Sequence, residues 1–386
     1  MKINKKTYTS SQIYATISTA IFLIIIYLPL SNEFLYFSEK QEVSKRENRQ
    51  LATKPKLDIS KLDPYPSLFD KYFDDHFIFR DKLLQYHTYL NFFLFKQSPI
   101  PEKVAIGKDS WLFYADKEKD VYEGKFNLSD EQISIIVNEL KQRDSIYKKS
   151  GIAFVILIAP TKAEIYSDFL PKYIQRAERT VTELIIEKIK KETDISVIYP
   201  KHTLMQKRNE FHTYHQFDNH WNQAGAFVAY QNLMNEIIDK FPHIQINTLD
   251  KGNVILKNEF SKGGNLANMI GLDNVLKEQN IFFEIKNKRA TEAEKRNYTP
   301  TPGFAYPSEY EIVYKTSLTN LSKALIIRDS YAGALIPYLS ESFGQSCFIF
   351  DAWQYGRNAE IIENEKPDII ILEIFEPHIS NILDNL

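Results

Sequence analysis

The stretch ALIIRDSYAG, at residues 324–333, decides which fold the sequence predicts. It begins with four apolar residues typical of a buried strand and continues through Asp329 and Ser330. After it, helical and strand patterns alternate: a helix at residues 332–343, a strand at 347–350, a helix at 358–365 and a strand at 368–375. Strands that alternate with helices predict right-handed crossovers in a parallel sheet. The sequence therefore predicts an α/β fold.

The same alternation precedes this stretch. The run IAFVILIA at residues 152–159 is continuously apolar, as a strand buried on both faces of a parallel sheet would be. Helices are expected at residues 129–149, 180–191 and 222–240, with a strand at 195–199 and two short strands within 104–114. The first of these helices has Ser129 as its N-cap and Gln132 at its third position, which predicts a capping box. Residues 241–321 show weaker periodicity, so we expect an irregular insertion there within a domain at 101–386.

The N-terminal residues 1–32 predict a membrane anchor. No charged residue occurs at positions 7–32, a stretch long enough as a helix to cross about 30 Å of hydrocarbon, and residues 13–30 within it are mostly apolar. Lys2, Lys5 and Lys6 precede this segment, whereas the first acid, Glu33, follows it. The positive-inside rule then keeps the N-terminus in the cytoplasm and places the rest of the chain outside it, in the periplasm or extracellular space. A cleavable signal peptide is the alternative, but no small-residue cleavage motif follows the apolar core.

Residues 33–100 are expected to connect the anchor to the domain at 101–386. The charged, proline-containing segment at 38–57 is typical of a tether, and aromatic residues at helical spacing predict short helices within 66–95. The net charge of −2 offers no broad attraction to nucleic acid. The only cysteine, Cys347, excludes an intramolecular disulfide.

Two short motifs carry residues suited to nucleophilic catalysis. Ser330 follows the strand of the first motif, at the edge of the sheet where α/β proteins bind ligands. Asp218 and His220 stand two residues apart in QFDNHWNQAG, a spacing that points both side chains the same way on extended backbone. Together they supply the serine, the histidine base and the orienting carboxylate of a catalytic triad. The alternatives are a helix cap at Ser330 and a surface aspartate beside a buried histidine.

A zinc site is a further alternative, because His202, His212, His215 and His220 fall close together along the chain. Histidines three residues apart are a common ligand pair on a helical turn. However, the sequence has neither an H-E-x-x-H motif nor a cysteine pair. We therefore expect neither a metal nor another cofactor.

The order of several short motifs resembles the SGNH-hydrolase-like polysaccharide O-acetyltransferases of the AlgJ/AlgX type and the related DHHW proteins. The matching pieces, in chain order, are Glu47-Asn48-Arg49, Phe73-Asp74-Asp75-His76-Phe77 with Phe79-Arg80-Asp81, Gly107-Lys108-Asp109-Ser110-Trp111-Leu112-Phe113, Ala159-Pro160-Thr161-Lys162, Asp218-Asn219-His220-Trp221 and Arg328-Asp329-Ser330-Tyr331. The resemblance implies an SGNH-hydrolase-like parallel sheet and a catalytic triad of Ser330, His220 and Asp218. Arg328 stands where the wider SGNH pattern has the glycine of G-D-S.

The resemblance also implies a function. It predicts a membrane-anchored O-acetyltransferase that modifies a cell-surface or secreted polysaccharide and receives acetyl groups from a membrane-bound O-acyltransferase partner. A carbohydrate acetyl esterase with the same triad and a non-catalytic glycan-binding protein are the alternatives. Residues expected to form the oxyanion site or to contact substrate are Tyr331, Arg328, Gly264, Asn265, Lys162, Trp353 and Tyr355.

Overall fold

The computed structural model describes residues 9–35, 43–44, 49–60, 62–77, 80–300, 302 and 304–385. The chain divides into two compact units, Met1–Phe95 and Lys96–Leu386. The motif pieces at residues 47–48 and 79 lie outside the described residues.

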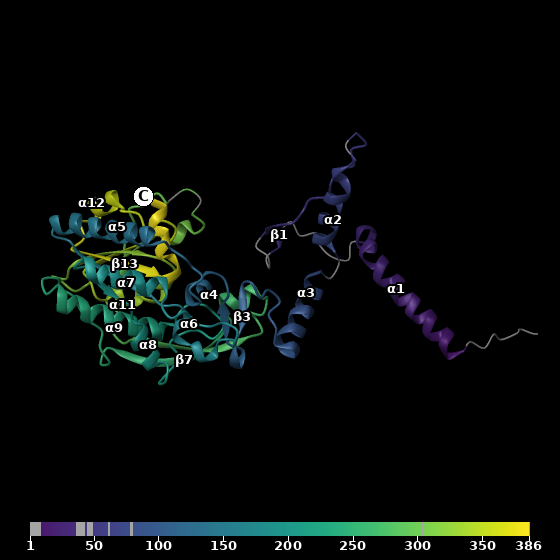
Figure 1. Cartoon of the computed structure of the whole chain (residues 1–386), viewed down its shortest axis with the longest axis horizontal. Helices are drawn as coiled ribbons and strands as arrows, with labels where there is room; N and C mark the ends of the chain where they lie inside the picture. Colours follow the sequence, from purple (N-terminus) through teal and green to yellow (C-terminus); the bar gives the residue numbers. More distant parts are fainter. Residues whose placement is uncertain are drawn as a thin grey trace, which may run out of the picture. The chain divides into compact units, whose positions relative to one another are not determined.

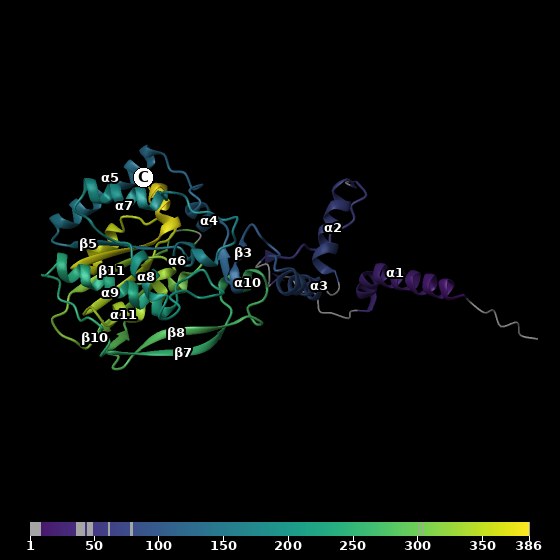
Figure 2. The same cartoon turned by 60° about the horizontal axis from the view of Figure 1, so that its bottom comes forward.

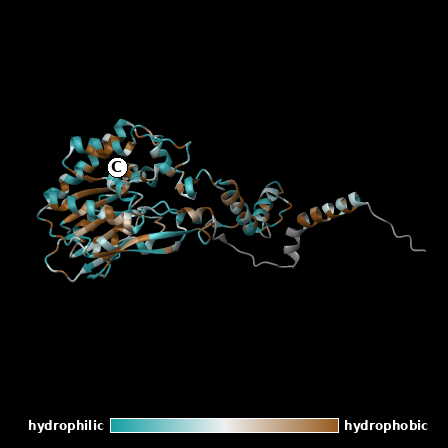
Figure 3. Cartoon of the chain, turned by 90° about the horizontal axis from the view of Figure 1, so that it is seen from below, coloured by the Kyte–Doolittle hydropathy of each residue, from teal (hydrophilic) through white to brown (hydrophobic). Residues whose placement is uncertain are grey.

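The first unit is mainly helical. Its elements are α1 (Ser10–Leu35), β1 (Val43–Ser44), β2 (Arg49–Gln50), α2 (Pro64–His76), α3 (Arg80–Tyr89) and the π-helical turn η1 (Leu90–Phe95). Helix α1 includes the predicted membrane-spanning segment and exposes apolar side chains such as Phe22 and Ile24. Brown, hydrophobic segments are visible along this helix in Figure 3. Within the part of the chain that the structure describes, however, no helix is both long and apolar enough to cross a membrane.

The second unit contains a seven-stranded sheet in its described residues, with the strand order β6-β5-β13-β11-β12-β10-β9. Strands β5 (Ala153–Ala159), β6 (Ser196–Ile198), β11 (Lys323–Arg328), β12 (Gln345–Phe350) and β13 (Ile369–Phe375) pair in parallel. Strands β10 (Glu311–Thr316) and β9 (Ala290–Glu292) extend one edge antiparallel. The predicted α/β fold with a mostly parallel sheet is confirmed.

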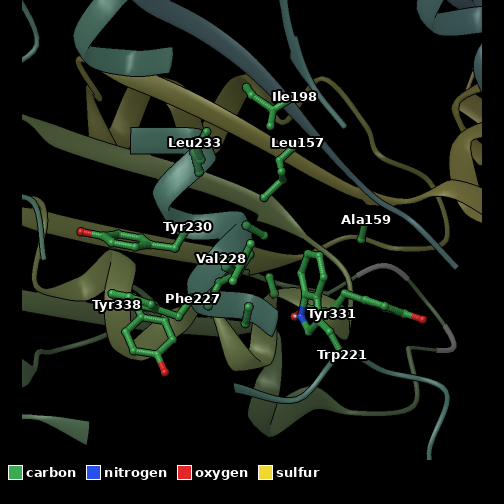
Figure 4. Packing of buried hydrophobic residues seen from close by; sticks show 14 of the residues in the cluster. Leu157, Ala159, Ile198, Trp221, Phe227, Val228, Tyr230, Leu233, Tyr331 and Tyr338 are labelled. Carbon is green, nitrogen blue, oxygen red and sulfur yellow. Dashed lines mark hydrogen bonds between the residues drawn. The ribbon is translucent and has the colours of Figure 1, made fainter. Parts of the chain in front are cut away.

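Helices cover both faces of this sheet. Figure 2 shows α5 (Asp130–Lys149) and α7 (Val181–Glu192) on one side, and α8 (Lys201–Lys207), α9 (Gln223–Lys240) and α11 (Ile336–Ser340) on the other. Successive residues of β5 point to opposite faces, so Ile156 packs with the α5 and α7 layer, whereas Leu157 packs with α9. Figure 4 shows part of the α9 side, where aromatic rings fill much of the core.

The shorter elements complete the second unit. They are β3 (Val104–Ile106), η2 (Lys108–Ser110), β4 (Leu112–Tyr114), α4 (Lys117–Tyr122), α6 (Lys162–Ile165), η3 (Ser167–Phe169), α10 (Asn265–Met269), η4 (Pro307–Glu309), η5 (Tyr331–Ala334), α12 (Ala359–Glu365) and η6 (Glu376–Asn385). Several of them, with α5 and α9, are labelled in Figure 1. The predicted capping box is present, because the Ser129 side chain accepts from the Gln132 N–H and the Gln132 side chain accepts from the Ser129 N–H.

Two local expectations are corrected. Residues 241–321 contain more regular structure than expected, because β7 (Val254–Lys262) and β8 (Lys277–Ile285) form a long antiparallel pair and β9 and β10 join the main sheet. The helix expected at 332–343 is instead the 3-10 turn η5 followed by the short α11. Pro337 near the start of α11 explains this break, since proline cannot donate the hydrogen bond that a continuous helix requires.

Candidate active site

Ser330, His220 and Asp218 form a hydrogen-bonded chain at the carboxyl end of strand β11. His220 Nδ1 lies 2.7 Å from Asp218 Oδ1, and His220 Nε2 lies 2.9 Å from Ser330 Oγ. Because a carboxylate only accepts hydrogen bonds, Nδ1 carries the proton, and Nε2 of the neutral ring is left to accept from the serine hydroxyl. Ser330 follows β11 and is exposed. The structure thus brings together the three residues that the sequence analysis grouped.

Asp218 is held in its ionised form by its neighbours. Burial alone would raise the pKa of its carboxyl group, but the hydrogen bond with His220 and the charge of that ring when it is protonated lower the pKa, and so does the backbone N–H of Asn265. This N–H donates to Asp218 Oδ2 over 2.7 Å, while the other oxygen also accepts from the His220 backbone. The net effect is a pKa well below the ordinary range. The carboxylate is therefore charged and fixed in direction, as orienting the imidazole requires.

Lys162 lies buried beneath the loop that carries Asp218. Its ammonium group donates to the backbone carbonyls of His215, Gln216 and Asp218, at 2.9, 3.1 and 2.7 Å. Burial lowers the pKa of Lys162 to about 8, although the acidic side chains around it oppose this shift. The sequence analysis expected Lys162 to contact substrate. That expectation is corrected, because the side chain is fully buried and all three of its donors hold the loop.

Glu278, from strand β8, holds the same loop from another side. Its carboxylate accepts from the backbone N–H groups of Gln216 and Phe217 and contacts His215 Nδ1 at 3.2 Å. The segment expected to be irregular thus supplies a carboxylate that shapes the site. The periodicity of the sequence around Glu278 gave no signal for this role.

Tyr331 and Trp221, the residues after Ser330 and His220, lock the two motifs together. The Trp221 indole donates to the Tyr331 carbonyl over 2.8 Å, and the Tyr331 hydroxyl donates to the Asn219 carbonyl over 2.8 Å. Both side chains are buried, and Figure 4 shows them side by side. Their reciprocal bonds set the separation of His220 and Ser330. Tyr331 was expected to contact the oxyanion or substrate, but its side chain instead holds the segments that carry Ser330 and His220 together.

Asp329 anchors the serine loop to the neighbouring strand β13. One of its carboxylate oxygens accepts from the Tyr355 hydroxyl at 2.8 Å and from the Phe375 backbone at 2.7 Å, and it lies 3.3 Å from His378 Nδ1. Burial would raise the pKa of Asp329, but the hydrogen bond and charge of His378 and these donors lower it. Tyr355 was expected to contact substrate. It is fully buried and supports Asp329 instead.

The Arg328 side chain is also buried and contacts other protein groups. Its guanidinium donates to the carbonyls of Asp329 and Glu309 and lies over the Phe350 ring at 4.4 Å from the centroid. With only 2% of its surface exposed, Arg328 is not available to substrate, which corrects the expectation for this residue. The arginine thus braces the serine loop against β12.

Gly264 and Asn265 contact the aspartate of the site. The Asn265 side-chain amide donates to Asn219 Oδ1 at 3.2 Å, and its backbone N–H is engaged by Asp218. A Cβ on Gly264 would lie 2.2 Å from Asp218 Oδ2. These residues were expected to donate to an oxyanion. In the structure their role is to fix the Asp218 carboxylate from the far side.

The histidines considered as zinc ligands are dispersed among other contacts. His215 faces Glu278, His212 packs edge-on against Trp111, and His220 bonds to Ser330. Among the described residues, no group of three or more His, Cys, Asp or Glu side chains is arranged to hold a metal ion.

Comparison with known proteins identifies the family of this site. A family model described as the SGNH hydrolase-like domain of the acetyltransferase AlgX matches residues 104–301, just over half of the chain. The chain belongs to this SGNH hydrolase-like acetyltransferase family. The family match includes Asp218 and His220 and ends before Ser330. No curated protein matches the chain by sequence.

Solved structures share the fold. PatB1 from Bacillus cereus is 17% identical over 71% of this chain and 96% of its own, with a TM-score of 0.52. The same protein carrying a sulfonyl adduct is 18% identical over 72% and 97%, with a TM-score of 0.51. A DHHW family protein from Eubacterium siraeum is 17% identical over 72% and 93%, with a TM-score of 0.50. At such low identities these similarities show the fold alone.

Proposed function

We propose that the protein transfers an acetyl group to hydroxyl groups of a polysaccharide through an acetyl-serine intermediate at Ser330. The observation that carries this proposal is the chain of contacts from Ser330 through His220 to Asp218. Membership of an acetyltransferase family supports the choice of acetyl as the group transferred. The acceptor class is inferred from the resemblance to AlgJ and AlgX.

The geometry supports two half-reactions with the same three side chains. In the first, His220 Nε2 takes the proton of the Ser330 hydroxyl while Oγ attacks the acetyl carbonyl of the donor. The imidazolium returns this proton to the leaving group, and Ser330 keeps the acetyl group as an ester. In the second half-reaction, His220 deprotonates a sugar hydroxyl, which attacks the acetyl carbonyl, and the Ser330 oxygen leaves and regains a proton. Asp218 orients the ring and stabilises its positive charge in both steps.

A direct assay separates transfer from hydrolysis. The full-length protein is supplied with a chromogenic acetyl ester, with and without an oligosaccharide acceptor, and the acetylated sugar is measured by mass spectrometry. We expect the acceptor to divert acetyl groups from water, because a bound hydroxyl beside the acyl-enzyme has a high effective concentration. Ester cleavage with no acetylated sugar for any acceptor would instead assign an esterase. Absence of both activities would leave the glycan-binding alternative.

We also propose that the second unit works outside the cytoplasm and receives its acetyl groups from a membrane-bound O-acyltransferase. The location rests on the uncharged residues 7–32 and the basic residues that precede them. A periplasmic reporter joined after Leu57 should be active, and a cytoplasmic reporter joined at the same place should be inactive. The reverse pattern would contradict export. As a control, each reporter is fused to a chain that starts after residue 32. In this control the cytoplasmic reporter should be active and the periplasmic reporter inactive.

A further inference from the structure

The second unit carries an exposed pair of aromatic rings. Tyr306 and Trp353 are 51% and 50% exposed, and their rings stack at an angle of 28° with centroids 6.5 Å apart. The sequence analysis singled out Trp353, but it did not predict Tyr306. Trp111 and Trp221, the other tryptophans, are buried.

The pair rests on a rigid aromatic base. Phe304 meets the Trp353 ring edge-on at 5.1 Å, and Phe350 lies 5.9 Å from it. Phe350 in turn lies under the guanidinium of Arg328. Contacts of this kind hold an aromatic side chain in one orientation before any ligand arrives, which lowers the entropy cost of binding.

Sheet register places Phe350 of this base at the same edge of the sheet as Ser330. Strands β11 and β12 are parallel neighbours, and their last residues, Arg328 and Phe350, are paired. Ser330 follows the first strand by two residues and Trp353 follows the second by three. The bond from the Asp351 N–H to the Arg328 carbonyl, 2.9 Å long, ties the two loops together at this edge. The aromatic pair therefore stands at the same edge of the sheet as the serine.

We propose that Tyr306 and Trp353 form an acceptor subsite that stacks against a pyranose ring of the polysaccharide. This inference rests on the proposed function for the identity of the acceptor. The faces of a pyranose ring carry C–H groups that lose water favourably against an aromatic surface, while its hydroxyls stay hydrated at the rim. Two side chains offer far less than the roughly 800 Å² per partner that a stable protein interface buries. A sugar ring matches the size of this patch better.

Binding is measured first, without any acetyl chemistry. The full-length Ser330→Ala variant is titrated with cellohexaose, chitohexaose and a hexamannuronate while tryptophan fluorescence is recorded. Trp353 is the half-exposed tryptophan, so stacking on it should shift or quench the emission. Isothermal titration calorimetry should then show affinity for that sugar falling about tenfold with Trp353→Ala or Tyr306→Ala added. If none of the three sugars binds, or if binding survives both substitutions, the subsite is refuted.

Transfer is measured second, with Ser330 intact. Trp353→Ala and Tyr306→Ala should each raise the acceptor KM about tenfold and lower the ratio of transfer to hydrolysis. Tyr173→Ala removes another aromatic ring, which is 67% exposed and does not belong to the pair, and it should leave both values unchanged. Thermal unfolding checks that each variant is folded. A subsite variant with a normal acceptor KM in vitro but reduced acetylation in cells would indicate a protein partner and overturn the proposal.

The two measurements separate this inference from the function on which it rests. If the sugar bound in a manner that depends on Trp353 but the protein had no transferase activity, the subsite proposal would be supported and the transferase proposal would be rejected. Transfer that is insensitive to Tyr306 and Trp353 would keep the transferase and reject the subsite.

Discussion

Ser330→Ala should leave a folded protein whose acetyl transfer falls by roughly three to six orders of magnitude. The substitution removes the oxygen that would carry the acetyl group. Ser330 is exposed at the end of its strand, so its loss should change the free energy of unfolding by no more than about 0.5 kcal/mol. The measurement is transfer to an oligosaccharide acceptor by each purified full-length variant, alongside its thermal unfolding.

Comparison with the other two side chains tests whether they act as a unit. His220→Ala should lose about as much activity as Ser330→Ala, because a nucleophile and its base fail together. Asp218→Ala should lose somewhat less, since this carboxylate only orients the base and stabilises its charge. Combining Ser330→Ala with His220→Ala should add little further loss. Additive losses in the double variant would contradict a shared mechanism.

Two further controls distinguish the serine mechanism from its alternatives. A sulfonyl fluoride should modify Ser330 in the wild type and leave Ser330→Ala unlabelled, as mass spectrometry of the digested protein would show. A chelator should leave transfer unchanged, whereas a catalytic zinc would be removed. If the Ser330→Ala variant acetylated its polysaccharide fully in cells and a chelator abolished this acetylation, the serine mechanism would be rejected in favour of a zinc site at the histidines.

Gly264→Ala should reduce transfer by about 10²- to 10⁴-fold, close to the effect of deleting Asp218. A Cβ at this position would lie 2.2 Å from Asp218 Oδ2 and 2.7 Å from Asp218 Cβ. The carboxylate would have to move, which would break its bond to the Asn265 N–H or its alignment with His220. Gly264 does not adopt a positive φ, so alanine introduces no backbone strain of that kind. The loss should therefore appear in kcat more than in stability.

Gly333→Ala is the matched control. Gly333 lies in η5, three residues from Ser330, but a Cβ there meets no atom within 4 Å, and its φ is not positive. This variant should transfer acetyl groups at the wild-type rate. Equal activity in Gly264→Ala and Gly333→Ala would show that Asp218 need not hold its observed position.

The sequence was informative where an element is determined by its own residues. The apolar run of β5, the capping box at Ser129 and the strands that alternate with helices each depend on local periodicity or on side chains three residues apart. The pairing of Asp218 with His220 is likewise local, because two residues separate them. The exposed serine followed from its place at the carboxyl end of a parallel strand.

The roles of the remaining site residues depended on contacts between distant segments. Lys162 and Trp353 both looked like solvent-facing substrate contacts in the sequence, yet only Trp353 is exposed. Whether a lysine meets water or three backbone carbonyls depends on which loop folds over it, and that loop lies more than 50 residues away along the chain. Tyr355 is buried for the same kind of reason, because Asp329 comes to lie against it.

By itself, the sequence determined the α/β class, the helix caps and the Asp218–His220 pair. The periodicity of apolar residues indicates which faces of helices and strands are buried, and caps and closely spaced pairs depend only on neighbouring residues. Only the tertiary structure decided that Gly264, Asn265 and Glu278 support the loop that carries Asp218 and that β9 and β10 complete the sheet. The first of these outcomes requires the segment at 254–285 to pack against a loop near residue 218, and the second requires β10 to pair with β12. No local pattern in the sequence indicates either contact. Long-range packing buries some polar groups beside a few specific partners, and those partners then determine each group's role.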